Sequence, residues 1–351
     1  MKFGLHYLLS CAATQSPVQR YRDTIEQAAR AEALGFESVW PVEQHFNRGV
    51  SILPCPTLLL AAIAERTRTL RLGTAITQLP LAHPARIAEE IATLDVLSGG
   101  RVEFGVGRGG NPIHFAGLGV PMDESRDRMV EALDYIRQAW TQERFSFQGR
   151  FFQADDLALV PQPIQRPHPP IRIAANSAET AEFAGREGYP IFVAANINPF
   201  PKLRKLVPLY RAAREQAGRT DAGGDDLTLL MPLYIGESRG QIERDVAPSV
   251  RHYGNLAASL IAPALEKTAS EEERQKLQAL LEHLRNITFD QVNDLMGIFD
   301  TPAACVERLQ QVYEEFKPGR VICWFNFGGL VPHDRVMRSM ELFSSRVLPH
   351  V

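Results

Sequence analysis

The sequence predicts an α/β protein, a (β/α)8 TIM barrel formed by one domain over residues 1–351. Short apolar segments alternate with amphipathic helical segments along the whole chain, as in a barrel of repeated strand–helix units. The apolar segments are continuous rather than alternating, which is typical of parallel strands covered on both faces. No change in composition marks a linker that would divide the chain into two domains.

Eight strand segments follow from the short apolar runs, each bounded by glycine, proline or polar residues. The eight segments lie near residues 2–7, 37–40, 70–76, 102–107, 171–175, 190–194, 227–235 and 320–326.

Helices are predicted between these strands from capping residues and apolar spacing. Ser16-Pro17 provides an N-cap and a first-turn proline, and Gly35 provides a C-cap. His83-Pro84 begins a helix with apolar residues at helical spacing that ends at Gly99-Gly100, and a further helix begins at Asp123. The remaining helices are expected over 177–188, 201–218, 238–252 and 301–316.

Two insertions interrupt the repeat. Near 141–170, the aromatic pairs around Gly149-Arg150 predict a hairpin, and a proline-rich connector follows it. Near 255–295, a polar helix beginning at Ser270 lies between the seventh and eighth strands. Its charged residues favour a solvated face, although an insertion after a barrel strand is also a candidate lid.

Charge and composition exclude several classes of protein. The 41 acidic and 38 basic residues give a net charge of −3, without the basic excess of nucleic-acid or anionic-membrane binding. No run approaches 18 apolar residues, so no membrane span is predicted. The four cysteines are far apart, which favours a reducing, cytoplasmic location and no zinc site.

A glycine-rich segment follows the fourth strand. Gly105 to Gly110 matches GxGxxG, but Asn111-Pro112 comes next and no periodic helix is predicted before Asp123. The dinucleotide-binding interpretation therefore fails on context. Two interpretations remain: a plain glycine turn, or a strand end that a flat ligand approaches closely, with Arg108 directed at an anion.

A second candidate anion site lies at the end of the fifth strand. Asn176 or Ser177 caps the next helix, where free backbone N–H groups and the hydroxyls of Ser177 and Thr180 could meet an anion. Any Asn/Ser cap has the same appearance, so this signal is weak by itself.

Glu43 and His45 follow the second strand, on a loop expected at the active end of a barrel. His45 is a candidate base or hydrogen-bond donor, with a satisfied loop histidine as the alternative. His83 fits a loop or cap better than a ligand. No histidine–carboxylate set has metal spacing, so no metal is predicted, and no nucleophile motif occurs.

Taken together, these segments resemble the bacterial luciferase-like flavin-dependent monooxygenases over nearly the full chain. The order and spacing of the matching segments carry the resemblance more than any single motif. They are residues 40–46 (WPVEQHF), 72–76 (LGTAI), 79–86 (LPLAHPAR), 95–109 (DVLSGGRVEFGVGRG) and, more weakly, 301–305 (TPAAC).

The resemblance implies a (β/α)8 barrel that binds reduced FMN at the carboxyl ends of its strands. The positions that match the family's phosphate site are Arg108, Arg126, Asn176, Ser177 and Thr180. Ala75-Ile76 matches a non-proline cis peptide beneath the flavin ring.

Four positions depart from the luciferases. Gln44 replaces a catalytic histidine, Gly107 replaces a reactive cysteine, Asn111 replaces a tyrosine, and His114 stands at an acidic position. Gln44 cannot act as a base, so light emission is not expected.

By resemblance, reduced FMN and O2 would form a C4a-(hydro)peroxyflavin that oxygenates a small organic substrate. His45 is the first candidate proton donor and His114 the second, and Glu43 would fix the tautomer of one of them. A separate NAD(P)H:flavin reductase would supply reduced FMN, and a homodimer is expected. Two alternatives remain: an F420-dependent oxidoreductase of the same superfamily, or a non-catalytic flavin-binding protein.

Overall fold

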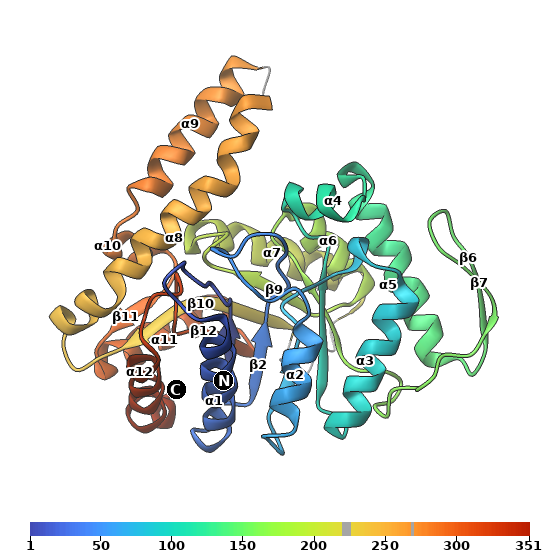
Figure 1. Cartoon of the computed structure of the whole chain (residues 1–351), viewed down its shortest axis with the longest axis horizontal. Helices are drawn as coiled ribbons and strands as arrows, with labels where there is room; N and C mark the ends of the chain where they lie inside the picture. The colour runs from blue at the N-terminus through green and yellow to red at the C-terminus, as the bar shows by residue number, and fades with distance from the viewer. Residues whose placement is uncertain (220–225, 268–269) are drawn as a thin grey trace.

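A computed structural model describes residues 1–219, 226–267 and 270–351, and within these residues eight parallel strands close into a barrel (Figure 1). This confirms the predicted fold, and each strand overlaps a predicted segment. The barrel strands are β1 (Lys2–Tyr7), β2 (Ser38–Pro41), β3 (Arg71–Gly73), β5 (Val102–Gly107), β8 (Ile171–Ala174), β9 (Ile191–Ala194), β10 (Leu227–Ile235) and β12 (Arg320–Trp324).

The barrel closes because β10 pairs with neighbours on both sides. Leu230 lies in register with Ala194 of β9 and with Ile322 of β12, while β12 continues to β1. Short strand β4 (Thr77–Gln78) continues the line of β3 along β5, and β11 (Ile298–Asp300) pairs with the end of β10. The carboxyl ends of all these parallel strands meet at one rim.

The predicted helices begin largely where the sequence places them, whereas the helices Pro56–Ala64 and His333–Arg346 were not predicted. Ser16 caps α1 through its side chain, and Gly99 ends α3 with a left-handed φ of 69°. The helices are α1 (Pro17–Ala33), α2 (Pro56–Ala64), α3 (Pro84–Ser98), α4 (Pro112–Leu118), α5 (Ser125–Thr141), α6 (Ala178–Glu187), α7 (Phe200–Gln216), α8 (Arg239–Lys267), α9 (Glu271–Arg285), α10 (Phe289–Leu295), α11 (Pro302–Phe316), α12 (His333–Arg346), and the 3-10 turns η1 (Leu79–Leu81), η2 (Met122–Glu124) and η3 (Leu348–His350).

The expectation of no helix between Asn111 and Asp123 is wrong. Asn111 caps the seven-residue helix α4, whose first residue is Pro112. Seven residues complete only two turns, too few to show an apolar period in the sequence. The fold still excludes the dinucleotide-binding interpretation, because β5 is a strand of a closed barrel.

The helix expected to end at His252 continues to Lys267 as α8. Gly254, within this longer helix, allows close packing, since a Cβ there would lie 2.2 Å from the backbone oxygen of Leu284. With α9, α8 forms a helical hairpin that stands up from the rim of the barrel (Figure 1). The predicted 255–295 insertion is therefore present, but α9 and the second half of α8 project away from the strand ends (Figure 1).

The 141–170 insertion contains the expected hairpin, formed by β6 (Phe145–Gln148) and β7 (Gln153–Leu157). The connector after it has cis peptide bonds before Pro161 and Pro167. None of the described helices is long and apolar enough to cross a membrane.

The barrel interior is filled in layers. At the amino ends of the strands, buried Glu103 accepts hydrogen bonds from Arg71, Arg172 and Arg320. Above this floor lies the fully buried indole of Trp40. Glycines make room for it: a Cβ on Gly73 would lie 2.2 Å from the ring. The interior of the barrel is therefore a packed core, which leaves the carboxyl rim as the place where the barrel lumen could hold a ligand.

Candidate active site at the carboxyl rim of the barrel

The loop after β2 positions an acid–histidine pair. The His45 Nε2 atom lies 2.9 Å from Glu43 Oε1, and the second carboxylate oxygen accepts a 3.0 Å hydrogen bond from the backbone N–H of Gln78. Both side chains are largely buried, with 14% and 11% of their surface exposed. Glu43 therefore fixes the His45 ring and holds a proton on Nε2. The Nδ1 atom of neutral His45 then carries the lone pair that can accept a proton.

His114 of α4 is buried directly beside this pair, and its hydrogen bonds define its tautomer. Its Nε2 atom accepts from the backbone N–H of His45 at 3.2 Å and lies 3.2 Å from the Asn111 amide nitrogen. Its Nδ1 atom must then carry the proton, which it donates to Gln78 Oε1 at 3.1 Å. Burial, and then the neighbouring His45, lower the pKa of His114 to about 4.

Gln78 joins the two histidines, and the sequence analysis did not single it out. Its side-chain amide donates to the Glu43 backbone oxygen at 3.1 Å and its carbonyl accepts from His114. A Cβ on Gly109 would lie 2.4 Å from Gln78 Oε1, so the glycine-rich segment also allows this contact. The only sequence signal was a polar residue in an otherwise apolar segment.

Gln44 has a different environment from its two neighbours. Its backbone N–H donates to the Leu53 oxygen at 3.0 Å, and the side chain is half-buried. Within the described residues its side-chain amide makes no hydrogen bond to the Glu43–His45–His114–Gln78 group. The four predicted catalytic positions therefore divide into three connected residues and one separate amide.

The peptide bond between Ala75 and Ile76 is cis, where the family resemblance places such a bond. Ile76 packs against β5 at Gly107, and a Cβ on that glycine would lie 2.3 Å from Ile76 Cδ1. Gly107 therefore allows the close approach of these two segments. A cysteine at position 107, as in the luciferases, would place its Cβ against Ile76, which gives a packing reason for glycine here.

The amino end of α6 brings together several of the residues predicted to bind an anion. Ser177 caps the helix by accepting from the backbone N–H of Thr180 at 3.3 Å, and the two hydroxyl oxygens are 3.0 Å apart. Arg126 of α5 reaches this end of α6 through an ion pair with Glu179. This corner therefore brings together one guanidinium, two hydroxyls and a helix amino end, partly offset by one carboxylate.

Arg108 and Asn176 lie at the same edge, since β5 and β8 are neighbours. The Arg108 side chain is exposed. Asn176 is engaged with protein groups: its amide oxygen accepts from the backbone N–H of Ala194 at 3.4 Å and from Asn198 at 3.3 Å. Asn176 therefore shapes the loop after β9, whereas Arg108 remains available to an anion.

Aromatic side chains cover the opposite side of the rim. Tyr253 of α8 packs on Phe327 and Trp324, with ring centroids 4.3 and 6.0 Å apart. The Tyr253 hydroxyl lies 3.3 Å from the amide nitrogen of Asn196, whose amide oxygen is buried without a hydrogen bond in the described structure. Tyr253 and Leu256, at the start of the 255–295 region, therefore reach the rim, and a Cβ on Gly49 of the loop after β2 would lie 2.9 Å from Leu256 Cδ2.

Comparison with known proteins agrees with this architecture. The profile described as luciferase-like monooxygenase matches residues 1–317, most of the chain. The chain belongs to the luciferase-like monooxygenase family.

Three relatives illustrate the range of this family. The monooxygenase RslO1 from Streptomyces bottropensis has the same fold with a TM-score of 0.78 and 28% identity, covering 100% of this chain and 99% of that one. The flavin-dependent trigonelline monooxygenase, oxygenase component, of Acinetobacter baylyi is 29% identical over 241 residues, 68% of this chain and 66% of that protein. The F420-dependent glucose-6-phosphate dehydrogenase of Amycolatopsis mediterranei is 31% identical over 263 residues, 73% and 76% of the two chains.

The luciferase-like family thus includes flavin-dependent and F420-dependent members. Within the described residues, no group of three or more histidine, cysteine, aspartate or glutamate side chains is arranged to hold a metal ion.

Proposed function

We propose that this chain is the oxygenase component of a two-component, FMN-dependent monooxygenase. Reduced FMN and O2 are consumed with a small organic substrate. The products are the substrate carrying one added oxygen atom, oxidised FMN and one water molecule. The electron pair comes from reduced FMN, so the chain needs no nicotinamide site of its own.

The Glu43–His45 pair is the observation that carries the proposal. Its 2.9 Å contact lies at the carboxyl rim, where barrel enzymes place their chemistry. Glu43 and Gln78 hold the ring in one orientation, which leaves His45 Nδ1 as the atom that can give or take a proton. Oxygen transfer from a reduced flavin requires such controlled protonation and exclusion of water.

The rim residues fit FMN. Ser177, Thr180, Arg126 and Arg108 provide cationic and hydroxyl groups suited to a phosphate at the amino end of α6. Ile76 packs on Gly107 at the end of β5, so the chain segment after β3 lies close to β5 at this part of the rim. The buried, unpaired Asn196 oxygen is an acceptor suited to a ring N–H donor. When bound, FMN supplies the redox chemistry and the reaction with O2.

The residues of this chain would bind the FMN phosphate, orient the flavin ring and keep water away from it. The α6 corner holds the phosphate and thereby fixes the ring at the rim. The aromatic group of Tyr253, Trp324 and Phe327 limits water at the other side of the rim. His45 exchanges the proton, and neutral His114 positions it by accepting the His45 backbone N–H.

The deciding experiment combines cofactor binding with isotope labelling. Purified protein, reduced FMN from a generic NADH:flavin reductase and a panel of aldehydes, ketones and aromatic substrates are incubated under 18O2. One labelled oxygen atom in the product supports the proposal. If reduced FMN binds but only hydrogen peroxide forms with every substrate, the chain is a flavin-binding protein without oxygenase activity.

An F420-dependent oxidoreductase is the second candidate, and the similarity to the glucose-6-phosphate dehydrogenase favours it. In that case substrate would bleach the deazaflavin absorbance of F420 without O2. F420 reduction together with no binding of reduced FMN would overturn the monooxygenase proposal.

The partners follow from the same proposal. A separate NAD(P)H:flavin reductase supplies reduced FMN, and the chain acts as a homodimer in the cytoplasm. Light scattering of the purified protein and cell fractionation test the last two statements.

A further inference from the structure

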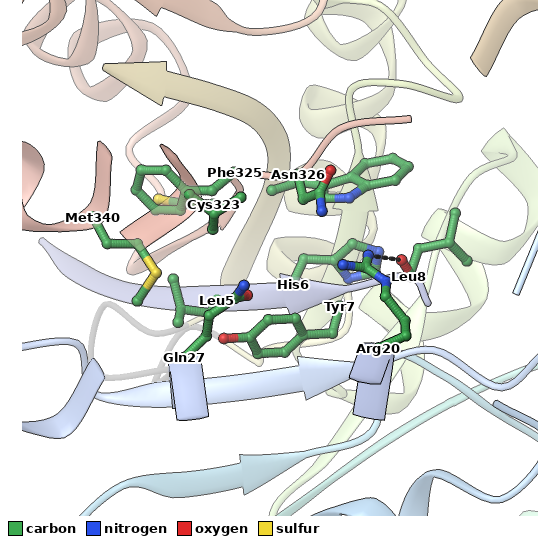
Figure 2. Close-up of a pocket in the computed structure, with 12 residues that line it drawn as sticks. Leu5, His6, Tyr7, Leu8, Arg20, Gln27, Cys323, Phe325, Asn326 and Met340 are labelled. Atoms are coloured by element: carbon green, nitrogen blue, oxygen red, sulfur yellow. Dashed lines mark hydrogen bonds between the residues drawn. The ribbon is translucent and has the colours of Figure 1, made fainter. Parts of the chain in front are cut away.

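A small cavity lies where β1 and β12 separate near the rim, between these strands and helices α1 and α12 (Figure 2). The two strands pair up to Leu5 and Cys323, and beyond this point no further pairing joins them. The cavity has room for the centre of one water-sized particle, about 10 Å3. That space suits a single water molecule or a monoatomic ion and excludes an organic molecule.

Four of the lining residues have a buried polar atom without a hydrogen bond. They are His6 Nδ1, Tyr7 Oη, Arg20 Nε and Trp324 Nε1. The guanidine and indole N–H groups can only donate and the phenol can donate, whereas neutral His6 has its one N–H engaged with the Trp40 backbone, so its Nδ1 atom is an acceptor. The unpaired set is therefore dominated by donors, as expected for a site that receives an acceptor or an anion.

Arg20 brings a positive charge into this cavity. Its side chain extends from α1 towards His6 (Figure 2) and the residue is only 9% exposed. Its one hydrogen bond to protein is a long contact of 3.4 Å from Nη2 to the Leu8 oxygen. In the described part of the chain, no carboxylate lies within ion-pair distance of it; Asp23, which Gln19 contacts at 2.7 Å, acts on it only through a longer electrostatic attraction. A buried guanidinium without a counter-ion is costly.

The residues around the cavity do not supply the missing negative charge. No aspartate or glutamate is among its lining residues. Burial raises the pKa of both the Tyr7 phenol and the Cys323 thiol, so both remain neutral at pH 7. Burial lowers the pKa of His6 to about 3, which leaves the imidazole neutral too. Arg20 is the one charged group that lines the cavity.

We propose that this cavity is a binding site for one small monovalent inorganic anion of halide size, held by Arg20 with the N–H donor of Trp324 and the O–H donor of Tyr7. The apolar lining of Leu5, Val336 and Met340 suits a weakly hydrated halide better than a strongly hydrated anion. Bound there, the anion neutralises Arg20 and bridges β1 and β12 where their backbone pairing ends.

Bromide is the probe for the first test, because its anomalous scattering distinguishes it from water. Crystals of the intact protein are grown in sodium bromide and measured at the bromine absorption edge. An anomalous peak in the cavity, within contact distance of Arg20 and Trp324, is expected. An oxygen-sized density without anomalous signal at that position would show a buried water instead and would overturn the proposal.

The second test is thermal unfolding in 100 mM sodium bromide and in sodium gluconate of equal ionic strength. The wild type should melt about 2 °C higher in bromide, because a ligand that binds only the folded state stabilises it. Arg20→Met should lose this difference. Arg22→Met, an exposed arginine of the same helix, should keep it. An equal bromide effect in both variants would contradict the site, and if Arg20→Met does not fold, the diffraction result on the wild type decides.

Discussion

The two ends of the barrel handle buried charge in opposite ways. At the amino end, Glu103 is only 3% exposed and accepts hydrogen bonds from three arginines. At the carboxyl rim, His114 is kept neutral and His45 retains a nitrogen without a partner among the described residues. This difference indicates which end of the barrel is structural. At the amino end, protein groups satisfy the buried charge of Glu103, whereas at the carboxyl rim His45 keeps a nitrogen that can contact a ligand.

The largest effect on stability is expected from disrupting the cluster of Glu103 and its three arginines at the amino end of the barrel. Burial by itself would raise the pKa of Glu103, but Arg320, Arg172 and Arg71 lower it to about 2, so the carboxylate is charged in the folded protein. Glu103→Gln leaves those guanidinium groups without their anion and should reduce the free energy of unfolding by about 3–5 kcal/mol. Urea unfolding followed by circular dichroism measures this loss.

The exposed pair of Arg144 and Asp156 is the matched control for this charge deletion. Asp156→Asn should cost far less stability than Glu103→Gln, because an exposed ion pair is screened by water. The folded fraction of Glu103→Gln should still bind FMN as the wild type does. Equal losses of unfolding free energy in the two variants would show that the Glu103–arginine cluster stabilises the protein no more than a surface ion pair does.

At the rim, the larger effect is on turnover. His45→Ala removes the proton-exchanging Nδ1 and should lower turnover by about 100-fold or more. The Kd for reduced FMN should stay within a factor of about two, because the phosphate corner is untouched. Single-turnover kinetics and anaerobic titration measure the two quantities.

His83→Asn is the control for that substitution. His83 caps α3 by accepting from the Ala85 N–H at 3.2 Å and does not belong to the rim network, and asparagine can cap in the same way. Its turnover should equal that of the wild type. If His45→Ala lost FMN affinity as much as turnover, His45 would be a binding residue and not the proton-exchanging group.

The neutral state of His114 predicts a pH dependence of stability. The pKa of His114 in the folded protein, about 4, lies below the ordinary value of 6.5. Between these two pH values the unfolded chain therefore binds a proton at His114 that the folded protein does not bind. Stability is complete above pH 6.5 and falls as the pH drops from about 6.5 towards 4, by up to about 1.4 kcal/mol per pH unit from this group.

His114→Asn tests this dependence, since the asparagine amide can still donate to Gln78 without titrating. The difference in unfolding free energy between wild type and variant should shrink as the pH falls from 7.5 to 4.5. Buried His6 also has a lowered pKa, but it is present in both proteins and cancels in the difference. A difference that stays constant with pH would show that His114 titrates normally.

The sequence was sufficient for the barrel because its strands are short apolar runs with clear ends. β5 and β10 have the predicted bounds. The limits of local pattern appear in α4, which is too short to show a period, and in α8, which continues past His252 with Gly254 packed closely on Leu284.

The candidate site was predictable in its residues but not in its connections. Glu43, His45 and His114 were named from the sequence, yet their link through Gln78 depends on contacts between residues far apart in the chain. The cavity at Arg20 gave no sequence signal, because a helix arginine ordinarily faces solvent. Which cation is buried without a counter-ion is decided by the packing of α1 on β1 and β12.

The smallest effect is expected from Ser177→Gly at the amino end of α6, the proposed phosphate site. Ser177→Gly removes the hydroxyl that lies 3.0 Å from Thr180 but keeps a residue that caps helices nearly as well, so stability should fall by only a few tenths of a kcal/mol. FMN affinity should fall by about fivefold, from the loss of one hydrogen bond to a charged group. Riboflavin, which lacks the phosphate, should bind both proteins equally in a fluorescence titration. An equal loss of affinity for FMN and riboflavin would show that the phosphate does not bind at the amino end of α6. Arg108, exposed at the end of β5, would then be the next phosphate-binding candidate to substitute.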